Sequence, residues 1–383
     1  MTKDVYITQT ASFMPNAPVG NDDMERILGQ AGHRPSRARR TVLRSNGIKT
    51  RHYAIDPVTL QPTHSNAQLA AEAVKKLGQQ YELKKIGVLA CGTSIPDQIV
   101  PGHGVMVHGE LELPETEVVS TSGVCISGAA ALKYAYFAVA TGQAESAIST
   151  GSELSSAVFG AKNYTAEVEH KVDALEDNAE LAFEKDFLRW MLSDGAGAVL
   201  LESTPRPGVL NLRVDWIEIQ SYAGEMETCM YAGGVKNEDG SIKGWARFDG
   251  DERAHQSVMA VKQDVRLLNE NIMHYAAEKP LAFAAKKHKL KPEDVDHFLP
   301  HYSSEFFRPR LFEAMAKIGF NVPYERWFTN LTTRGNTGAA SIYIMLDELL
   351  KSGRVTPGQR ILCWVPESGR FSGCFFLVTA VQG

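Results

Sequence analysis

The chain has 383 residues, of which 44% are hydrophobic and 22% are charged, and these proportions are typical of an ordinary globular protein. This length is enough for two or three domains, or for one large duplicated domain. The net charge of −5 argues against nucleic acid as a main partner. The sequence contains no run of about 18 apolar residues and no signal-peptide pattern, so we expect neither a membrane span nor export.

The cysteines are scattered, odd in number and without any CxxC pair. They are Cys91, Cys125, Cys229, Cys363 and Cys374. This usage suits a reducing compartment, and we therefore expect a cytoplasmic protein. It offers no zinc framework, so no metal site is predicted.

The N-terminal part of the chain begins with alternating residues 5–11, which predict a strand. Two basic stretches follow at residues 34–44 and 46–52. One interpretation is a solvated surface. The other is an attachment patch for a phosphate-bearing carrier, such as coenzyme A, or for the acidic surface of an acyl carrier protein. The apolar run 85–91 predicts a further strand, and its exit at Gly92-Thr-Ser suits a site-lining loop.

Residues 117–136 are the stretch around which the chain is organised. A β-branched run, a turn at Ser122-Gly123 and a long Ala-rich run predict a strand, a tight turn and a helix, with Cys125 in or near the first helical turn. The free amides and partial positive charge of a helix N-terminus favour a thiolate and can hold the oxyanion formed when it attacks a thioester. The alternative is that Cys125 is simply a small buried apolar residue.

The first half of the chain ends with further strand patterns. Residues 146–153 predict a strand that exits at Glu153, and residues 191–201 predict a Gly-punctuated turn into another strand. Between them, an acidic and polar segment at about residues 163–186 has helical spacing. We interpret it as an inserted excursion that serves as a lid or faces a dimer partner.

The second half repeats this alternation. Its expected elements are a strand at 212–220, a long helix at about 251–287, a strand at 296–301 that ends on His301, a helix at 336–350 entered through Asn336, and final strands at 360–365 and 374–381. Alternating strands and helices predict an α/β protein. The two similar halves, residues 1–203 and 204–383, indicate an internal duplication, and without a Pro/Ser linker between them we expect one compact body.

Three features together resemble a known family. The Cys125 turn, His301 at a strand end and Gly335-Asn336-Thr-Gly-Ala-Ala-Ser look like the Cys-His-Asn triad of the β-ketoacyl-acyl-carrier-protein synthase III enzymes of the thiolase superfamily. Asp194-Gly-Ala-Gly-Ala-Val and the segment 46–52 resemble that family at corresponding places. The resemblance implies a thiolase fold, in which two duplicated α/β halves form a five-layered αβαβα body, and a homodimer.

The resemblance also implies roles for these residues. An acyl group would be transferred to Cys125, and His301 and Asn336 would donate hydrogen bonds to the carbonyl of the second thioester as it becomes an enolate. As alternatives, His301 is a structural histidine, and Asn336 an N-cap.

The substrates implied are acyl thioesters of coenzyme A or of an acyl carrier protein, with no permanently bound cofactor. Arg44 and Arg51 are the candidates to hold the carrier. A loop amide would complete the oxyanion hole beside the amide of the nucleophile, and Gly369, Ser372 and Gly373 all qualify by sequence.

Three departures from the family pattern point to a particular branch, and one of them is the inserted segment at about residues 163–186. The chain has His301-Tyr-Ser-Ser where the family usually has His-Gln-Ala-Asn, and Glu367-Ser-Gly-Arg-Phe-Ser-Gly373 where it has a Gly-rich, Trp-containing loop. The pattern is more similar to the ketosynthase/cyclases that build dialkylresorcinols and 1,3-cyclohexanediones from an acyl and a β-ketoacyl thioester. Glu153 is our hypothesis for the base in the ring-closing step, and a helix-start or interface carboxylate is the alternative.

Three other functions stay open from the sequence. One is the classical decarboxylative condensation with a malonyl thioester. Another is a thiolase-fold acyltransferase to oxygen or nitrogen, against which the retained Asn336 argues. The third is a non-catalytic partner subunit, which would have no reason to keep the nucleophile.

Overall fold

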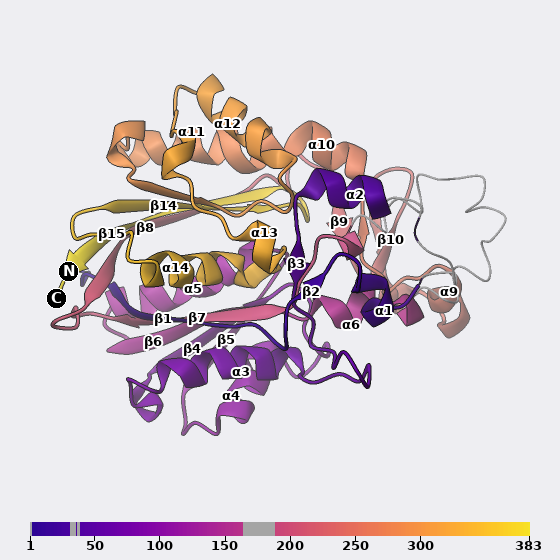
Figure 1. Ribbon diagram of the computed structural model, residues 1–383, viewed down its shortest axis with the longest axis horizontal. Helices are drawn as coiled ribbons and strands as arrows, with labels where there is room; N and C mark the ends of the chain where they lie inside the picture. The colour runs from indigo at the N-terminus through magenta and orange to yellow at the C-terminus, as the bar shows by residue number, and fades with distance from the viewer. Residues whose placement is uncertain (1, 31–35, 37–38, 164–187) are drawn as a thin grey trace.

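The computed structural model describes residues 2–30, 36, 39–163 and 188–383. The excursion expected at about residues 163–186 lies, apart from Asn163, outside this described part. Figure 1 shows the architecture as stacked layers of helices and sheet, in the order helix, sheet, helix, sheet, helix. No helix among the described residues is long and apolar enough to cross a membrane.

The lower sheet in Figure 1 is built from the first half of the chain. Its strands are β1 (Tyr6–Phe13), β7 (Gly195–Glu202), β6 (Ser146–Glu153), β4 (Val88–Thr93) and β5 (Glu117–Ser122), in that spatial order. Strand β4 runs parallel to both β5 and β6, whereas β7 is antiparallel to β1 and β6. Strand β5 forms the outer edge of the sheet.

The upper sheet is built from the second half of the chain. Its strands are β8 (Leu210–Ser221), β15 (Ser372–Gln382), β14 (Arg360–Glu367) and β13 (His297–Pro300), in that order. The two sheets are joined through β1 and β8, which share only the pairs Tyr6↔Arg213 and Ile7↔Leu212. The proposed boundary between residues 203 and 204 falls in the connection from β7 to β8.

Two helices form the central layer between the sheets, namely α5 (Ile126–Ala140) and α14 (Ser341–Lys351). The Ala-rich sequence of α5 allows a close approach, and Gly128 on α5 and Gly151 on β6 both face the carbonyl of Ala339. A Cβ at these glycines would lie 2.3 Å and 2.2 Å from that oxygen, so larger residues do not fit. This contact brings the segment that follows Asn336 against the first turn of α5.

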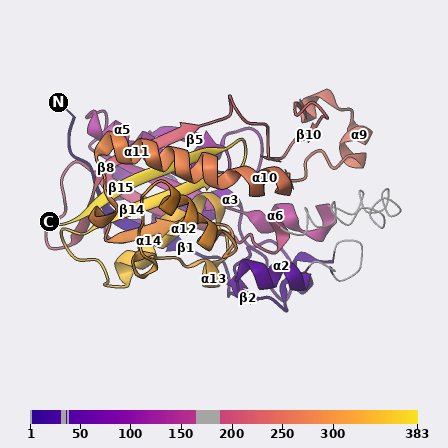
Figure 2. The same ribbon diagram turned by 90° about the horizontal axis from the view of Figure 1, so that it is seen from above.

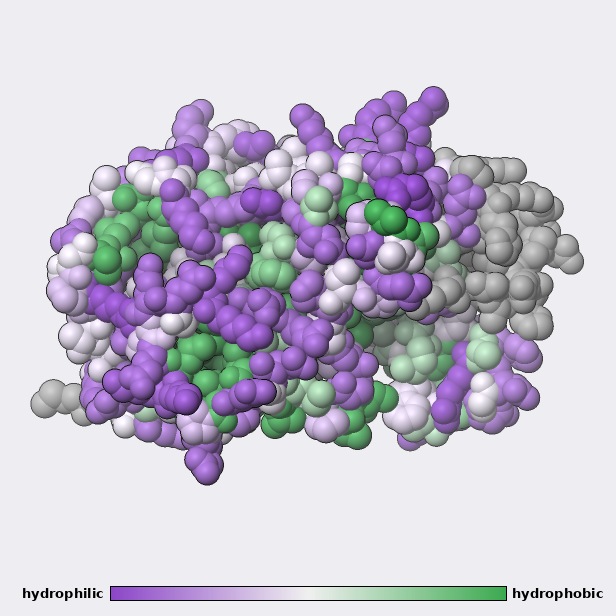
Figure 3. All heavy atoms as spheres, turned by 60° about the horizontal axis from the view of Figure 1, so that its bottom comes forward, coloured by the Kyte–Doolittle hydropathy of each residue, from purple (hydrophilic) through white to green (hydrophobic). Residues whose placement is uncertain are grey.

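Helices also cover the outer faces of both sheets. Helices α3 (Asn66–Leu77) and α4 (His103–Leu111) pack under the lower sheet, and α10 (Val265–Met273), α11 (Lys279–His288) and α12 (Phe307–Lys317) pack over the upper one. Figure 3, which brings the lower face forward, shows mostly hydrophilic residues with separate apolar patches, as expected for an outer layer.

The remaining described elements are short. They are β2 (Val19–Gly20), α1 (Met24–Leu28), α2 (Arg39–Asn46), β3 (Thr50–Arg51), α6 (Ser155–Phe159), β9 (Met230–Tyr231), β10 (Gly234–Lys236), β11 (Ile242–Gly244), α9 (Gly250–His255), β12 (Lys262–Gln263), α13 (Leu331–Arg334) and single helical turns at 83–85, 161–163, 245–247, 292–294, 324–326 and 338–340. Seen from above, α2, α6 and α9 gather at one end of the molecule, and both termini lie at the other (Figure 2).

The single long helix expected at about residues 251–287 is wrong. Helix α9 ends at His255, the chain turns through Ser257 at a φ of 44°, and β12 intervenes before α10 begins. Asp264 starts the new helix, because its side chain accepts a hydrogen bond from the amide of Leu267 (2.9 Å). A further π-helical turn, His274–Glu278, joins α10 to α11.

Candidate active site

Cys125 lies where β5 ends and α5 begins. Gly123 has a φ of 149°, which lets the chain turn sharply out of the strand. Cys125 itself is the N-cap residue of α5 and is partly buried. The predicted strand, turn and helix are therefore confirmed, and the thiol lies at the N-terminus of a helix of fifteen residues.

An apolar cavity opens beside Cys125, with a volume of about 90 Å³. Its polar lining includes Glu153, His301 and Asn336 together with the thiol, and these groups come from both halves of the chain. Most of the other lining residues are apolar, among them Ile95, Leu154, Val158, Phe159, Leu188, Met191, Leu192, Met230, Val261, Leu268, Ile272, Met273, Phe307 and Trp364. The four residues expected from the sequence are thus assembled around one cavity suited to an acyl chain.

His301 directly follows β13 and is 4% exposed. Its amide donates a hydrogen bond to the carbonyl of Trp364 (2.9 Å) on β14, and this bond fixes the strand exit. Burial lowers the pKa of His301 to about 4. The imidazole is therefore neutral near pH 7 and is suited to donate a hydrogen bond without bringing a charge.

Asn336 is held by backbone bonds on both sides. Its amide donates to the carbonyl of Met191 (2.9 Å), and its carbonyl accepts from the amide of Ser193 (2.9 Å). The side-chain Oδ1 accepts from the amide of Gly338 (3.0 Å). Because the oxygen is engaged in this way, the Nδ2 group is the end that can serve a ligand. Helix α14 is capped at Ala340, so Asn336 is not its N-cap.

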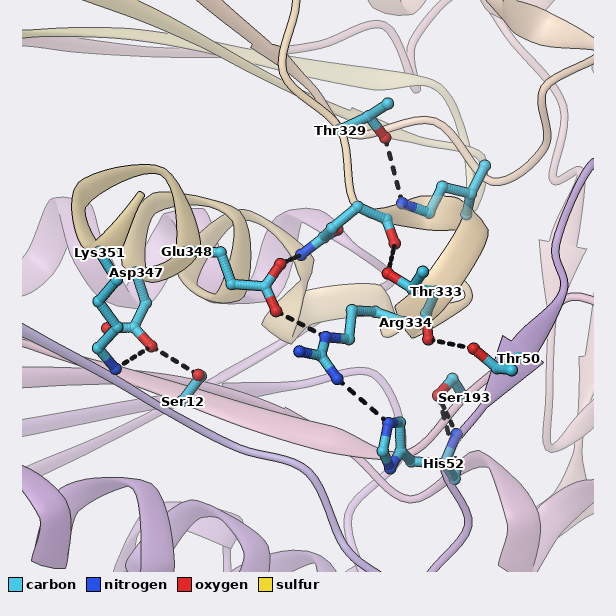
Figure 4. A network of polar contacts seen from close by, with 12 residues as sticks. Ser12, Thr50, His52, Ser193, Thr329, Thr333, Arg334, Asp347, Glu348 and Lys351 are labelled. Carbon is cyan, nitrogen blue, oxygen red and sulfur yellow. Dashed lines mark hydrogen bonds and ion pairs between the residues drawn. The ribbon is translucent and has the colours of Figure 1, made fainter. Parts of the chain in front are cut away.

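A polar network fixes the segment just before Asn336, as Figure 4 shows. Arg334 Nε donates to Glu348 Oε1 on α14 (2.6 Å), and its Nη1 lies 3.4 Å from Nε2 of His52. Thr50 Oγ1 donates to the carbonyl of Thr333 (2.7 Å). The turn that presents Asn336 is thus tied to both the central layer and the N-terminal segment.

Glu153 is the last residue of β6 and is 5% exposed. Its Oε1 accepts hydrogen bonds from the amide of Ser94 (3.1 Å), from Ser94 Oγ (2.5 Å) and from the amide of Ala339 (3.0 Å). All three bonds engage Oε1, so Oε2 is the oxygen that can act in the cavity. Burial raises the pKa of Glu153 to about 7, against the opposing effect of these bonds.

The electrostatic surroundings of Cys125 differ from those expected at a helix N-terminus. Burial raises the pKa of the thiol, and the carboxylates of Glu153 and Glu367 raise it further. Glu367 lies close by because its Oε1 accepts a hydrogen bond from the amide of Val124 (3.3 Å). Sequence reasoning did not assign Glu367 to the site, since its contact with residue 124 depends on the packing of distant segments.

The structure contradicts the expected role of Arg51 in binding a carrier. The side chain is fully buried, and its guanidinium donates to the carbonyl of Trp190 and to Asn21 Oδ1 (2.6 Å). Burial lowers the pKa of Arg51 to about 10. Arg51 therefore braces the N-terminal segment and cannot face a phosphate. Arg44, by contrast, lies exposed on α2.

The structure distinguishes the three residues that were candidates to supply the second amide of the oxyanion hole. Gly369 lies against the turn at residues 123–125 that leads into α5, because a Cβ at this position would be 3.1 Å from Val124 Cγ2. Ser372 and Gly373 are inside β15, where they pair with both β14 and β8, and a Cβ at Gly373 would lie 2.6 Å from the carbonyl of Ala276. The expectation for Ser372 and Gly373 is wrong because sheet packing occupies them.

Comparisons with known proteins agree with this fold. Residues 285–378 match the family "3-Oxoacyl-[acyl-carrier-protein (ACP)] synthase III C terminal". The whole chain superposes on AbyA1, a tetronic acid condensing enzyme, with 19% identity and a TM-score of 0.75 over 99% of this chain and 100% of that one.

Two further solved structures are similar over the full length. The 3-oxoacyl-(acyl carrier protein) synthase III FabH from Pseudomonas aeruginosa PAO1 has 17% identity and a TM-score of 0.72 over 100% of this chain and 99% of that one. A single-residue variant of OleA from Xanthomonas campestris has 18% identity and a TM-score of 0.72 over 99% of this chain and 97% of that one. The predicted thiolase-like α/β fold is confirmed. The family match over residues 285–378 covers the C-terminal part of this fold, from which His301 and Asn336 come.

Proposed function

We propose that the protein joins an acyl group carried on Cys125 to a β-ketoacyl thioester by a new C–C bond, and then closes a ring toward a 1,3-cyclohexanedione or dialkylresorcinol precursor. One observation carries this proposal. Cys125, Glu153, His301 and Asn336 line a single, mostly apolar cavity. A nucleophile, two neutral hydrogen-bond donors and a carboxylate base are the groups that such a sequence of reactions requires.

In the first step, the sulfur of Cys125 attacks the thioester carbonyl of the acyl donor. A new C–S bond forms, the carrier thiolate leaves and takes up the proton given up by Cys125, and the acyl chain extends along the apolar lining. The amide groups at the N-terminus of α5 are suited to hold the oxyanion that develops in this step, and an amide at Gly369 is the candidate to assist them.

In the second step, the β-ketoacyl thioester loses the proton between its two carbonyls and attacks the acyl group. The electron pair forms the new C–C bond, and the sulfur of Cys125 is released. His301 and the Nδ2 group of Asn336 are the donors that stabilise the enolate, since neither brings a competing negative charge.

Glu153 is the proposed base for removing protons from the activated methylene groups. For ring closure, the acyl group is α,β-unsaturated: the carbanion formed at C4 of the β-ketoacyl part adds to the β-carbon of the acyl part, the C=C π bond breaks as the second C–C bond forms, and the α-carbon takes up the proton. Glu153 can act only as the carboxylate, and burial raises its pKa to about 7. Below pH 7 the rate of the base-dependent step should therefore rise about tenfold per pH unit, and above pH 7 it should level off. A pH–rate profile of single-turnover condensation on a preformed acyl-enzyme measures this dependence.

The matched control for this pH dependence is Glu153→Gln. The variant keeps an oxygen to accept from Ser94 and Ala339 but has no titrating carboxylate, so we expect a flat profile and a rate lower by about 10²-fold or more. A variant that condenses and cyclises at the normal rate would remove Glu153 from the mechanism.

The proposed acyl donors are thioesters of coenzyme A or of an acyl carrier protein, in keeping with the family matched by the C-terminal part of the chain. The exposed Arg44 on α2 is the proposed contact for the carrier, at the end of the molecule where α6 also lies (Figure 2). An acidic carrier or a phosphate group would be attracted to this position.

We also propose a homodimer, formed across the outer edge of β5. Within the described part of the chain no strand pairs with this edge, and exposed apolar residues lie next to it on α5. Phe137 is 50% exposed, and Tyr134, which is 36% exposed, donates to Glu117 on β5.

Phe137→Asp should convert the dimer into a monomer, as measured by light scattering after gel filtration. Val58→Asp, at another exposed apolar position in a distant loop, should leave the mass unchanged. A dimeric Phe137→Asp protein would contradict this interface.

The test of the proposed function is product analysis. The protein is incubated with an acyl thioester and a β-ketoacyl thioester, and the products are identified by mass spectrometry. A cyclic dione would support the proposal. Carbon dioxide release with a malonyl thioester, and no reaction with a β-ketoacyl thioester, would favour the decarboxylative alternative. Acylated alcohols or amines without a new C–C bond would favour an acyltransferase to oxygen or nitrogen.

A further inference from the structure

Glu367 ends β14, where the chain turns into the hairpin that leads to β15. Its Oε1 accepts a hydrogen bond from the amide of Val124 (3.3 Å), and Val124 directly precedes Cys125. A carboxylate from the second half of the chain thus lies against the loop that carries the nucleophile in the first half.

Close packing gives this carboxylate a defined position. A Cβ added at Gly369 would lie 2.8 Å from Glu367 Oε1 and 3.1 Å from Val124 Cγ2, so the glycine leaves room for the carboxylate in its present position. Glu367 is also paired with Ser372 in the strand ladder. The pairing of Glu367 with Ser372 and the packing at Gly369 therefore keep the carboxylate beside residues 123–125.

The charges around Cys125 are of one sign. Glu153 and Glu367 act in the same direction on the pKa of the thiol, in addition to burial, which is the largest cause of its rise. No lysine or arginine is among the described residues that line the cavity, and His301 is neutral because burial lowers its pKa to about 4. Arg370, in the hairpin, is exposed and donates its Nε to a backbone carbonyl (2.7 Å). The described lining therefore offers no cation to balance a carboxylate on a substrate.

We propose that Glu367 is a specificity-determining residue that disfavours a second thioester with a free carboxylate and favours an uncharged β-ketoacyl thioester. This inference rests on the proposed function, because it takes Cys125 to be the point where the two thioesters meet. Malonyl and acetoacetyl groups have nearly the same size and shape. The malonyl group ends in a charged carboxylate, whereas the acetoacetyl group has an uncharged methyl group in place of one carboxylate oxygen. Repulsion between like charges in a partly solvated site corresponds to a discrimination on the order of tenfold.

The experiment compares the malonyl and acetoacetyl derivatives of carba(dethia)pantetheine, in which a CH₂ group replaces the thioester sulfur so that Cys125 cannot be acylated, as ligands of the wild-type protein and of Glu367→Gln. Each ligand is titrated for its protection of Cys125 from alkylation by iodoacetamide, which gives two dissociation constants per protein. We expect the ratio of the malonyl to the acetoacetyl constant to fall about tenfold in Glu367→Gln. Glu367→Asp, which keeps the charge, should retain most of the wild-type ratio. Added salt should lower the ratio in the wild type more than in Glu367→Gln.

A purely structural role of Glu367 would change both constants by the same factor and leave their ratio as in the wild type. An unchanged ratio in Glu367→Gln would therefore overturn the proposal. Because protection measures binding, this result is independent of turnover. If the ratio falls but neither thioester condenses on the acyl-enzyme, the exclusion of charge stands and the proposed condensation fails.

Discussion

Replacement of Cys125 by alanine should abolish the covalent acyl-enzyme and lower condensation by at least about 10³-fold. Cys125 is the only cysteine among the described residues that line the cavity, so no other thiol there can carry the acyl group as a thioester. Intact-protein mass spectrometry after incubation with a series of acyl thioesters measures the adduct directly. The acyl group that gives the fastest mass gain also identifies the chain length that the cavity prefers.

The matched control for this replacement is Cys91→Ala. Cys91 is fully buried on β4, and burial raises the pKa of its thiol to about 12. The control should therefore acylate like the wild type, provided that it folds, which circular dichroism monitors. An adduct of equal mass on Cys125→Ala, or no adduct on the wild type with any thioester, would show that Cys125 is not the nucleophile.

Replacement of His301 or Asn336 by alanine should separate the two steps of the reaction. Each residue is proposed to stabilise the enolate of the second thioester, and loss of one such donor typically costs about 10²–10³ in rate. Acylation of Cys125 does not need an enolate, so the mass gain should persist while condensation falls by that factor. The measurement is single-turnover condensation on an acyl-enzyme that has been formed beforehand.

Asn336→Asp sharpens this test because it keeps the shape of the side chain. The aspartate can still accept from the amide of Gly338, as Oδ1 of Asn336 does, but it replaces the Nδ2 donor by a charged acceptor. We expect it to condense no faster than Asn336→Ala. If the rates of acylation and condensation fell by equal factors in these variants, the two residues would act in the acylation step or stabilise the fold. They would then not be the donors that stabilise the enolate.

The sequence was sufficient to predict where Cys125 and His301 lie in the fold, because each of them stands where a local pattern begins or ends. Gly123 and the Ala-rich run that follows place Cys125 at the start of α5, and the short strand before His301 places that residue at a strand exit. Asp264 before the periodic run of α10 is also a recognisable helix start, so the division of the expected long helix was readable in the sequence.

Other features depend on contacts between distant segments and have no local signature. Arg51 stands in a basic stretch that suggests a surface, yet Trp190 and Asn21 enclose it in the interior. Glu367 and Val124 meet across 243 positions in the chain. The apolar lining of the cavity is equally a product of tertiary packing, since it combines residues from α6, β9 and α10.

The distribution of the site over two sheets that share only two residue pairs has a consequence for how the protein is made. During synthesis, the segment with Cys125 and Glu153 is complete long before His301 and Asn336 emerge. A nascent chain that has folded only its first sheet presents a thiol without the donors proposed for carbon–carbon bond formation. In the proposed mechanism, condensation therefore becomes possible only once the last strands have paired.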